Sequence, residues 1–133
     1  MITAIDTNIL LDIFLPDPVF GRKSLSAVES AAATGGLVIC NIVYAELVPQ
    51  FKDKNILDLT LKKININVIP ITNETCFLAG ITWNKYRQSQ KGKGSRRIIT
   101  DFLIGAFACV QADRFLTRDR GFYRKYFSNI KIL

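Results

Sequence analysis

The sequence contains no histidine among its 133 residues. Because histidine is the usual general base and a common ligand of zinc and haem iron, its absence excludes Ser-His-Asp catalysis, Cys-His catalysis and any histidine-ligated metal centre. The three cysteines, Cys40, Cys76 and Cys109, lie far apart in apolar stretches and form no Cys-x-x-Cys pair. We expect them to be buried thiols in a reducing compartment. Any chemistry must therefore rely on carboxylates, lysines, hydroxyls or a metal held by oxygen.

Long hydrophobic runs are also missing. The longest, residues 102–110, is about half as long as a membrane span requires. The chain begins almost directly with a short apolar stretch that is too short for a secretion signal. With 49% hydrophobic residues it can still build a core. We therefore expect one cytoplasmic domain over residues 1–133, with no membrane association.

Short apolar runs alternate with longer helical patterns, and this alternation is typical of an α/β fold with a mostly parallel sheet. The predicted sheet has four to five strands flanked by helices. We expect strands at 2–5, 37–40, 68–71 and 115–117, with a closing strand at 130–133. We expect helices at 8–14, 22–33, 55–63, 73–90 and 100–111, a further helix from Asn41 through Glu46, and a short aromatic helix after residue 119. Asn41 and Asn73 are the expected N-caps of their helices.

Four acidic residues lie where a solitary charge is costly. Asp6 and Asp119 each follow a predicted strand, and the carboxyl ends of parallel strands open onto the binding crevice of such sheets. Capping or a turn would also explain either residue alone. Glu46 shares a helix face with apolar side chains, and Asp101 opens a helix whose following residues are uncharged. Capping alone would account for Asp101 as well.

The combination of these four acids indicates more than any one of them. If the two strands are neighbours, Asp6 and Asp119 emerge at the same edge of the sheet, and the helices can bring Glu46 and Asp101 alongside. Two carboxylates about 4 Å apart repel by roughly 4 kcal/mol at an effective dielectric constant of about 20. Such a cluster must take up protons or bind a hard cation. An all-oxygen site without histidine or thiolate favours Mg²⁺ or Mn²⁺.

Four motifs carry a resemblance to a known family. They are Asp6-Thr7-Asn8-Ile9-Leu10-Leu11-Asp12, the mid-chain Glu46, Asp101-Phe102-Leu103-Ile104-Gly105-Ala106 and Thr117-Arg118-Asp119. In their order and spacing the chain resembles PIN-domain proteins over essentially its whole length, and its small form is similar to the VapC-type toxins of toxin–antitoxin pairs. The resemblance implies a PIN-like three-layer fold and an endoribonuclease that depends on Mg²⁺ or Mn²⁺. It also implies an antitoxin partner and a homodimer.

The resemblance assigns roles to individual residues. By position, Asp6, Glu46, Asp101 and Asp119 match the acidic quartet that binds the metal and carries catalysis in this family. Asn8 and Thr117 match polar neighbours that orient those carboxylates. Asp12 belongs to the first motif but lies away from the quartet, and we expect a structural or surface role for it. Some relatives carry a further acid just after the last aspartate. This chain has Gly121 there, which puts a full second metal site in doubt.

The net charge of +7 fits an RNA substrate. Basic residues border both ends of the predicted acidic site, as a groove that follows phosphates would require, although such runs are also common on solvated surfaces. The candidate RNA-binding residues are Lys91, Lys93, Arg96, Arg97, Arg118 and Arg120. Tyr86, Tyr123 and Tyr126 are expected to stack on bases, to pack in the core or to form dimer contacts.

Three alternatives also remain open: a binding module without turnover, a phosphoryl-accepting receiver and a haloacid-dehalogenase-like phosphatase. The chain would be a binding module without turnover if the fold binds RNA or protein but does not cleave, and the intact acidic quartet argues against this alternative. A phosphoryl-accepting receiver requires an acid after the third strand, and a haloacid-dehalogenase-like phosphatase requires one two positions after Asp6. Neither acid is present, since residues 69–72 are uncharged and Asn8 occupies the second position. The receiver and the phosphatase are therefore both disfavoured.

Overall fold

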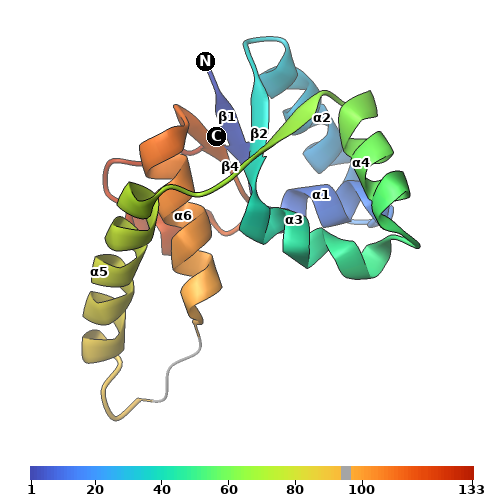
Figure 1. Ribbon diagram of the computed structural model, residues 1–133. Helices are drawn as coiled ribbons and strands as arrows, with labels where there is room; N and C mark the ends of the chain where they lie inside the picture. The colour runs from blue at the N-terminus through green and yellow to red at the C-terminus, as the bar shows by residue number, and fades with distance from the viewer. Residues whose placement is uncertain (94–96) are drawn as a thin grey trace.

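The computed structural model describes residues 1–93 and 97–133. Arg96, one of the predicted RNA-binding residues, lies outside the described residues. A central sheet separates two groups of helices, with α5 and α6 on one side and α1, α2 and α4 on the other (Figure 1). This arrangement is the predicted three-layer α/β fold.

The sheet is parallel throughout its four strands, which are β1 (Thr3–Ile5), β2 (Leu37–Cys40), β3 (Ile66–Ile69) and β4 (Arg114–Leu116). Their order is β3-β2-β1-β4. The last strand therefore pairs directly with the first, with Thr3 opposite Arg114 and Ile5 opposite Leu116. This pairing places the carboxyl ends of β1 and β4 side by side.

Two strand predictions differ from the structure. The third strand begins two residues before the predicted start at residue 68 and ends before Pro70, which has no amide hydrogen to donate to a neighbouring strand. Its start is set by Asn65, whose φ of 56° reverses the chain after the preceding helix. The predicted closing strand at 130–133 is reduced to one bridge, between Phe115 and Ile132.

The helices lie close to their predicted places. Their bounds are α1 (Thr7–Phe14), α2 (Gly21–Ala32), α3 (Asn41–Leu47), the 3₁₀ turn η1 (Val48–Gln50), α4 (Lys54–Lys63), α5 (Asn73–Ser89), α6 (Ile99–Gln111) and α7 (Arg120–Tyr126).

The predicted asparagine caps are wrong by one residue. The N-cap of α5 is Thr72, whose hydroxyl accepts a hydrogen bond from the backbone amide of Thr75, so Asn73 is the first helical residue. The N-cap of α3 is Cys40, the last residue of β2, and Asn41 is again the first helical residue. In both cases the helix starts immediately where extended backbone ends.

The core lies on both faces of the sheet and is built largely from β1, β2, β4 and α6. Phe102, Phe107 and Phe115 are almost fully buried in it. The thiols are only partly as predicted, because Cys40 is buried and Cys109 half-buried, whereas Cys76 is exposed on the outer face of α5.

Within residues 1–93 and 97–133, no helix is both long and apolar enough to cross a membrane.

Candidate active site

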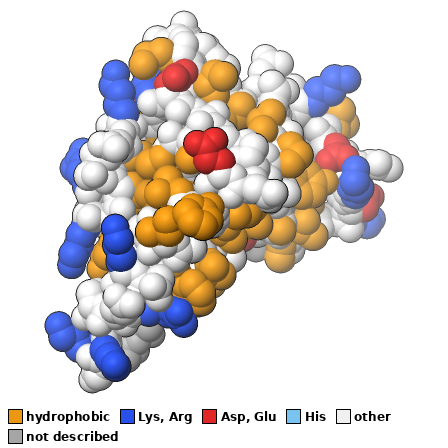
Figure 2. Space-filling view, turned by 60° about the vertical axis from the view of Figure 1, so that its left-hand side comes forward, with side chains coloured by type: hydrophobic (Ala, Val, Ile, Leu, Met, Phe, Trp, Pro, Cys, Tyr) orange, Lys and Arg blue, Asp and Glu red, His pale blue; other side chains and the backbone are white. Residues whose placement is uncertain are grey.

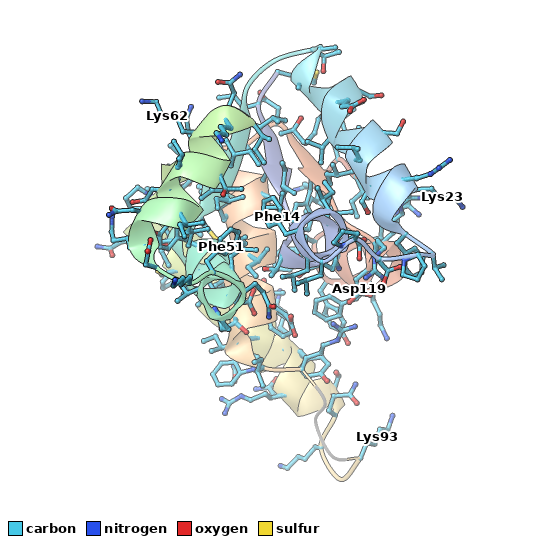
Figure 3. All side chains as sticks on the ribbon, turned by 90° about the vertical axis from the view of Figure 1, so that its right-hand side faces the viewer. Phe14, Lys23, Phe51, Lys62, Lys93 and Asp119 are labelled. Atoms are coloured by element: carbon cyan, nitrogen blue, oxygen red, sulfur yellow. The ribbon has the colours of Figure 1, made fainter. Side chains whose placement is uncertain are left out.

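Asp6 and Asp119 lie at the adjacent carboxyl ends of the neighbouring strands β1 and β4. Asp6 follows β1 directly, and Asp119 follows β4 after Thr117 and Arg118. In Figure 3, Asp119 lies just beyond α1, between Lys23 on α2 and the protruding tip that carries Lys93. The strand order thus brings together two acids that are far apart in the sequence, as the sequence predicted.

Asp6 is buried and held by hydrogen bonds. One carboxylate oxygen accepts from the amide of Thr7 at 2.7 Å, and the other accepts from the hydroxyl of Thr117 at 2.7 Å. Burial raises the pKa of Asp6 to about 6, against the effect of those two hydrogen bonds, and the negative charges of Glu46 and Asp101 raise it further. Asp6 is therefore both the N-cap of α1 and the deepest acid of the site.

Glu46 reaches this site from α3. Its carboxylate accepts a hydrogen bond from the hydroxyl of Thr7 at 2.5 Å. Thr7 in turn donates its amide to Asp6, so one residue holds two acids of the predicted quartet in place. Although Glu46 is exposed, its side chain lines the same cleft as Asp6.

Asp101 and Asp119 share a basic partner, Arg97. A guanidinium nitrogen of Arg97 lies 2.7 Å from Asp119 and 3.8 Å from Asp101. Burial raises the pKa of Asp101, the charge of Arg97 opposes that effect, and Glu46 and Asp119 add to it. Burial alone would lower the pKa of Arg97, but its hydrogen bond and ion pair with Asp119 raise it. The carboxylate of Asp119 is therefore engaged inside the site, not in a turn.

These side chains line one open cleft of about 280 Å³. Its lining consists of Asp6, Thr7, Asn8, Leu11, Glu46, Arg97, Asp101, Ile104, Asp119 and Tyr123. Among the residues that the structure describes, no three acidic or sulfur side chains lie close enough together to hold a metal ion as they stand. Ligands from this cleft would have to draw together when a cation binds.

The donor chemistry of the cleft nevertheless suits a hard divalent cation. All of its acidic donors are oxygens, which Mg²⁺ and Mn²⁺ prefer. Burial raises the pKa of Asp6 and of Asp101, and repulsion from the neighbouring carboxylates raises both further. A cation with two positive charges would relieve this repulsion.

The two residues expected to orient the acids both contact Asp6. The hydroxyl of Thr117 donates to Asp6 and accepts from the amide of Asp119 at 3.0 Å, so it links the two strand ends. Asn8 donates to Asp6 at a longer 3.4 Å and accepts from the amide of Arg118. Thr117 is nearly fully buried, and its contacts are the closer of the two.

Asp12 has a structural position, not one at the surface. It is 4% exposed and accepts from the hydroxyl of Ser24 at 2.7 Å. Its carboxylate also binds the guanidinium of Arg118 through two hydrogen bonds, at 2.7 and 3.0 Å. Asp12 therefore joins α1 to α2 and to the segment after β4.

The predicted RNA-binding residues fall into two groups. Lys91, Lys93 and Arg120 are exposed. Arg97 turns into the acidic cleft, and Arg118 is paired with a carboxylate while its guanidinium lies 4.0 Å from the centre of the Phe20 ring.

The surface around the tip is basic. In Figure 2 the lower, protruding end of the molecule carries several Lys and Arg side chains, whereas hydrophobic side chains gather across the middle. This end contains the last turns of α5 and the residues that follow, where Lys85, Arg87, Lys91 and Lys93 are exposed.

The three tyrosines considered for base stacking lie mainly in the core. Tyr86 and Tyr123 are 5% and 2% exposed, and only Tyr126 is half-buried. Tyr123 packs its ring against Phe115 and forms part of the cleft wall, where burial and three neighbouring carboxylates raise its pKa. The packing alternative is therefore correct for Tyr86 and Tyr123.

Sequence reasoning missed two contributors to the site. Thr7 received no role, although its place beside Asp6 in the first motif could have drawn attention to it. The contact of Arg97 with the acids was also missed, although Arg97 lies four residues before Asp101, a spacing that brings side chains together at the start of a helix.

The sequence was compared with the profiles of known protein families. The sequence profile of the PIN domain matches residues 3–128. This chain belongs to the PIN domain family. No curated protein matches it.

Several solved structures have the same fold as this PIN domain. VapBC2 from Rickettsia felis bound to a DNA fragment from their promoter matches with a TM-score of 0.70 and 22% identity, over 100% of this chain and 98% of that one. VapBC-1 from nontypeable Haemophilus influenzae matches with a TM-score of 0.69 and 19% identity, over 100% and 97%. FitAcB from Neisseria gonorrhoeae matches with a TM-score of 0.68 and 18% identity, over 100% and 96%. At these identities the likeness shows the fold.

Proposed function

We propose that this PIN domain is an endoribonuclease dependent on Mg²⁺ or Mn²⁺ and acts as the toxin of a toxin–antitoxin pair. The observation that carries the proposal is the convergence of Asp6, Glu46, Asp101 and Asp119 on one cleft. These acids come from four separate parts of the fold, and burial together with repulsion from neighbouring carboxylates makes the ionised forms of Asp6 and Asp101 costly without a cation. Membership of the PIN domain family supports nuclease chemistry for this cleft.

Asp6 and Asp101 are the best direct ligands for the cation, with Glu46 and Asp119 binding directly or through water. A divalent ion supplies Lewis-acid chemistry: it lowers the pKa of water and stabilises the charge that develops on phosphate. Thr117 and Thr7 orient the carboxylates of Asp6 and Glu46 by hydrogen bonds before a cation binds.

The phosphodiester bond is cleaved by water in this proposal. Water attacks phosphorus in line, and its proton passes to Glu46 or Asp119. The bond to the 3′-oxygen breaks, and this oxygen takes up a proton from solvent. The products then carry a 5′-phosphate and a 3′-hydroxyl. This chemistry needs no histidine, in agreement with the composition.

The exposed basic residues at the tip and after β4 would hold the RNA backbone. Lys91 and Lys93 precede Asp101 in the sequence, and Arg120 follows Asp119. Their positive charges suit phosphate. Because phosphate contacts release counterions, RNA affinity is expected to fall steeply as salt is raised.

Cleavage of structured RNAs by the purified protein tests the proposal. Cleavage is expected with Mg²⁺ or Mn²⁺ and lost with EDTA. Asp6→Asn and Asp101→Asn each abolish cleavage while RNA affinity stays the same or rises, and Glu29→Gln, at an exposed acid on α2, serves as the matched control. Binding without cleavage by the unmodified protein in any of these metals would favour the silent binding module instead.

The antitoxin and the homodimer belong to the same proposal. Exposed apolar side chains, including Phe77 at 71% and Ile98 at 63%, provide surface for protein partners. The matched solved structures are themselves complexes, which supports an antitoxin partner. A short neighbouring reading frame with a DNA-binding start and an acidic end should encode it, and co-expression should suppress cleavage. Light scattering of the isolated chain should give twice its mass of 15.0 kDa.

A further inference from the structure

Arg97 places a fixed positive charge inside the acidic cleft. It lies just before α6, and one guanidinium nitrogen contacts both Asp119, at 2.7 Å, and Asp101, at 3.8 Å. Its side chain is 32% exposed, so the contact with Asp119 is partly shielded from water. A guanidinium stays charged at every accessible pH, so this charge is permanent.

An aromatic ring also contacts the guanidinium of Arg97. The centre of the Phe122 ring, from α7, lies 4.0 Å from the guanidinium carbon of Arg97. Such cation–π contacts favour the charged group at a partly desolvated position. Phe122 itself packs edge-on against Phe102 in α6, so the ring that supports Arg97 is anchored in the core.

The charge of Arg97 divides the cleft into two unequal halves. The half formed by Asp119 and one side of Asp101 is compensated by the guanidinium. Within the described part of the chain, no salt bridge reaches Asp6 or Glu46, whose partners are hydroxyl and amide groups. A divalent cation gains most where charge is uncompensated, which is the half with Asp6 and Glu46.

We propose that Arg97 takes the place of a second metal ion, so that each chain binds one divalent cation. This inference rests on the proposed metal-dependent function and specifies its metal content. The tethered guanidinium is present at the site at a high effective concentration, which a free cation must overcome to reach Asp119. Asp6, Glu46 and Asp101 then hold the single ion, and Arg97 keeps Asp119 neutralised beside it.

Metal content can be measured without any activity assay. Titration with Mn²⁺ by calorimetry, and native mass spectrometry, should give one ion per chain for the unmodified protein. Arg97→Ala should bind a second ion, and its electron paramagnetic resonance spectrum should show coupling between neighbouring Mn²⁺ ions. Arg97→Lys, which keeps the positive charge, should still bind one.

The matched control is Arg87→Ala. Arg87 is also an arginine stacked on an aromatic ring, 4.3 Å from the centre of Trp83, but it lies on α5 and does not line the cleft. This variant should bind one ion, and thermal unfolding of every variant checks that it is folded.

The outcomes separate this inference from the proposed function. Two ions in the unmodified protein, or one ion in Arg97→Ala, would overturn the role of Arg97 and leave metal dependence intact. Uptake of no Mn²⁺ by any variant would overturn both. A second ion that appears only in Arg97→Ala supports the inference.

Discussion

The burial of Asp6 predicts a stability that depends on pH in a definite direction. Its pKa is raised from 3.8 to about 6 in the folded protein. A carboxyl group whose pKa is raised on folding is harder to ionise in the folded state, so it stabilises the fold while protonated and weakens it once charged. The shift of roughly two pKa units corresponds to about 3 kcal/mol.

The loss occurs in a defined pH window. Below about pH 4 Asp6 is protonated in both the folded and the unfolded state, so the cost of ionising it in the folded state is absent. Between about pH 4 and 6 the unfolded chain ionises first, so the free energy of unfolding falls as pH rises, and above the folded pKa the full cost is present. Asp6→Asn removes this ionisation and should therefore stabilise the metal-free protein at pH 8 by up to about 3 kcal/mol.

Urea unfolding of the metal-free protein and of Asp6→Asn at pH 4.5 and pH 8 measures this effect. The difference between the two proteins should grow with pH, whereas Glu29→Gln, which alters an exposed acid, should show little change. Adding Mn²⁺ at pH 8 should stabilise the unmodified protein but not Asp6→Asn, because the cation binds only the folded acidic cleft. An equal difference at both pH values would refute the reasoning, since no buried ionisation would then be linked to folding.

Three further predictions concern parts of the fold outside the acidic cleft. Asp12→Asn should destabilise the protein by about 2–4 kcal/mol and lower the melting midpoint by roughly 6–12 °C, because the guanidinium of Arg118 loses its carboxylate partner. A melting midpoint no lower than that of Glu29→Gln would contradict this. Gly105→Ala should lower the free energy of unfolding in urea by about 1–2 kcal/mol, because the new methyl would come within 2.5 Å of the buried Phe127 ring, and this clash outweighs the gain in helix propensity. A stabilised variant would show that the ring moves aside. A thiol reagent should label Cys76 rapidly, the half-buried Cys109 more slowly and the buried Cys40 only after unfolding, and mass spectrometry of the labelled peptides would reveal any other order.

Elements with a strong local pattern could be predicted from the sequence. The apolar runs at β1, β2 and β4 and the long apolar helix α6 have boundaries within one or two residues of the prediction. The third strand was misplaced because the apolar residues that mark a strand continue to Ile71, whereas the pairing with β2 ends at Ile69. Pairing is a property of the neighbouring strand, which a local pattern does not contain.

The acidic cleft was predictable for a related reason. Asp6 and Asp119 follow apolar strands, and in a parallel sheet this position alone brings them to the same edge. The contacts made by arginine were not predictable in the same way. Arg97 and Arg118 look alike in the sequence as members of basic runs, yet each binds a carboxylate whose position depends on tertiary packing.

The pairing of the last strand with the first has a consequence for a ribosome making this chain. Thr3 leaves the ribosome early, but its partner Arg114 is translated 111 residues later, and the nearby Asp119 follows it. Until they emerge, Asp6 and Glu46 lack the other wall of their cleft, and a parallel strand pair of such long sequence separation is slow to form. A nascent chain that has not reached Asp119, or one truncated before it, therefore cannot perform the chemistry of the complete acidic cleft, which becomes possible only after β4 and Asp119 have been synthesised.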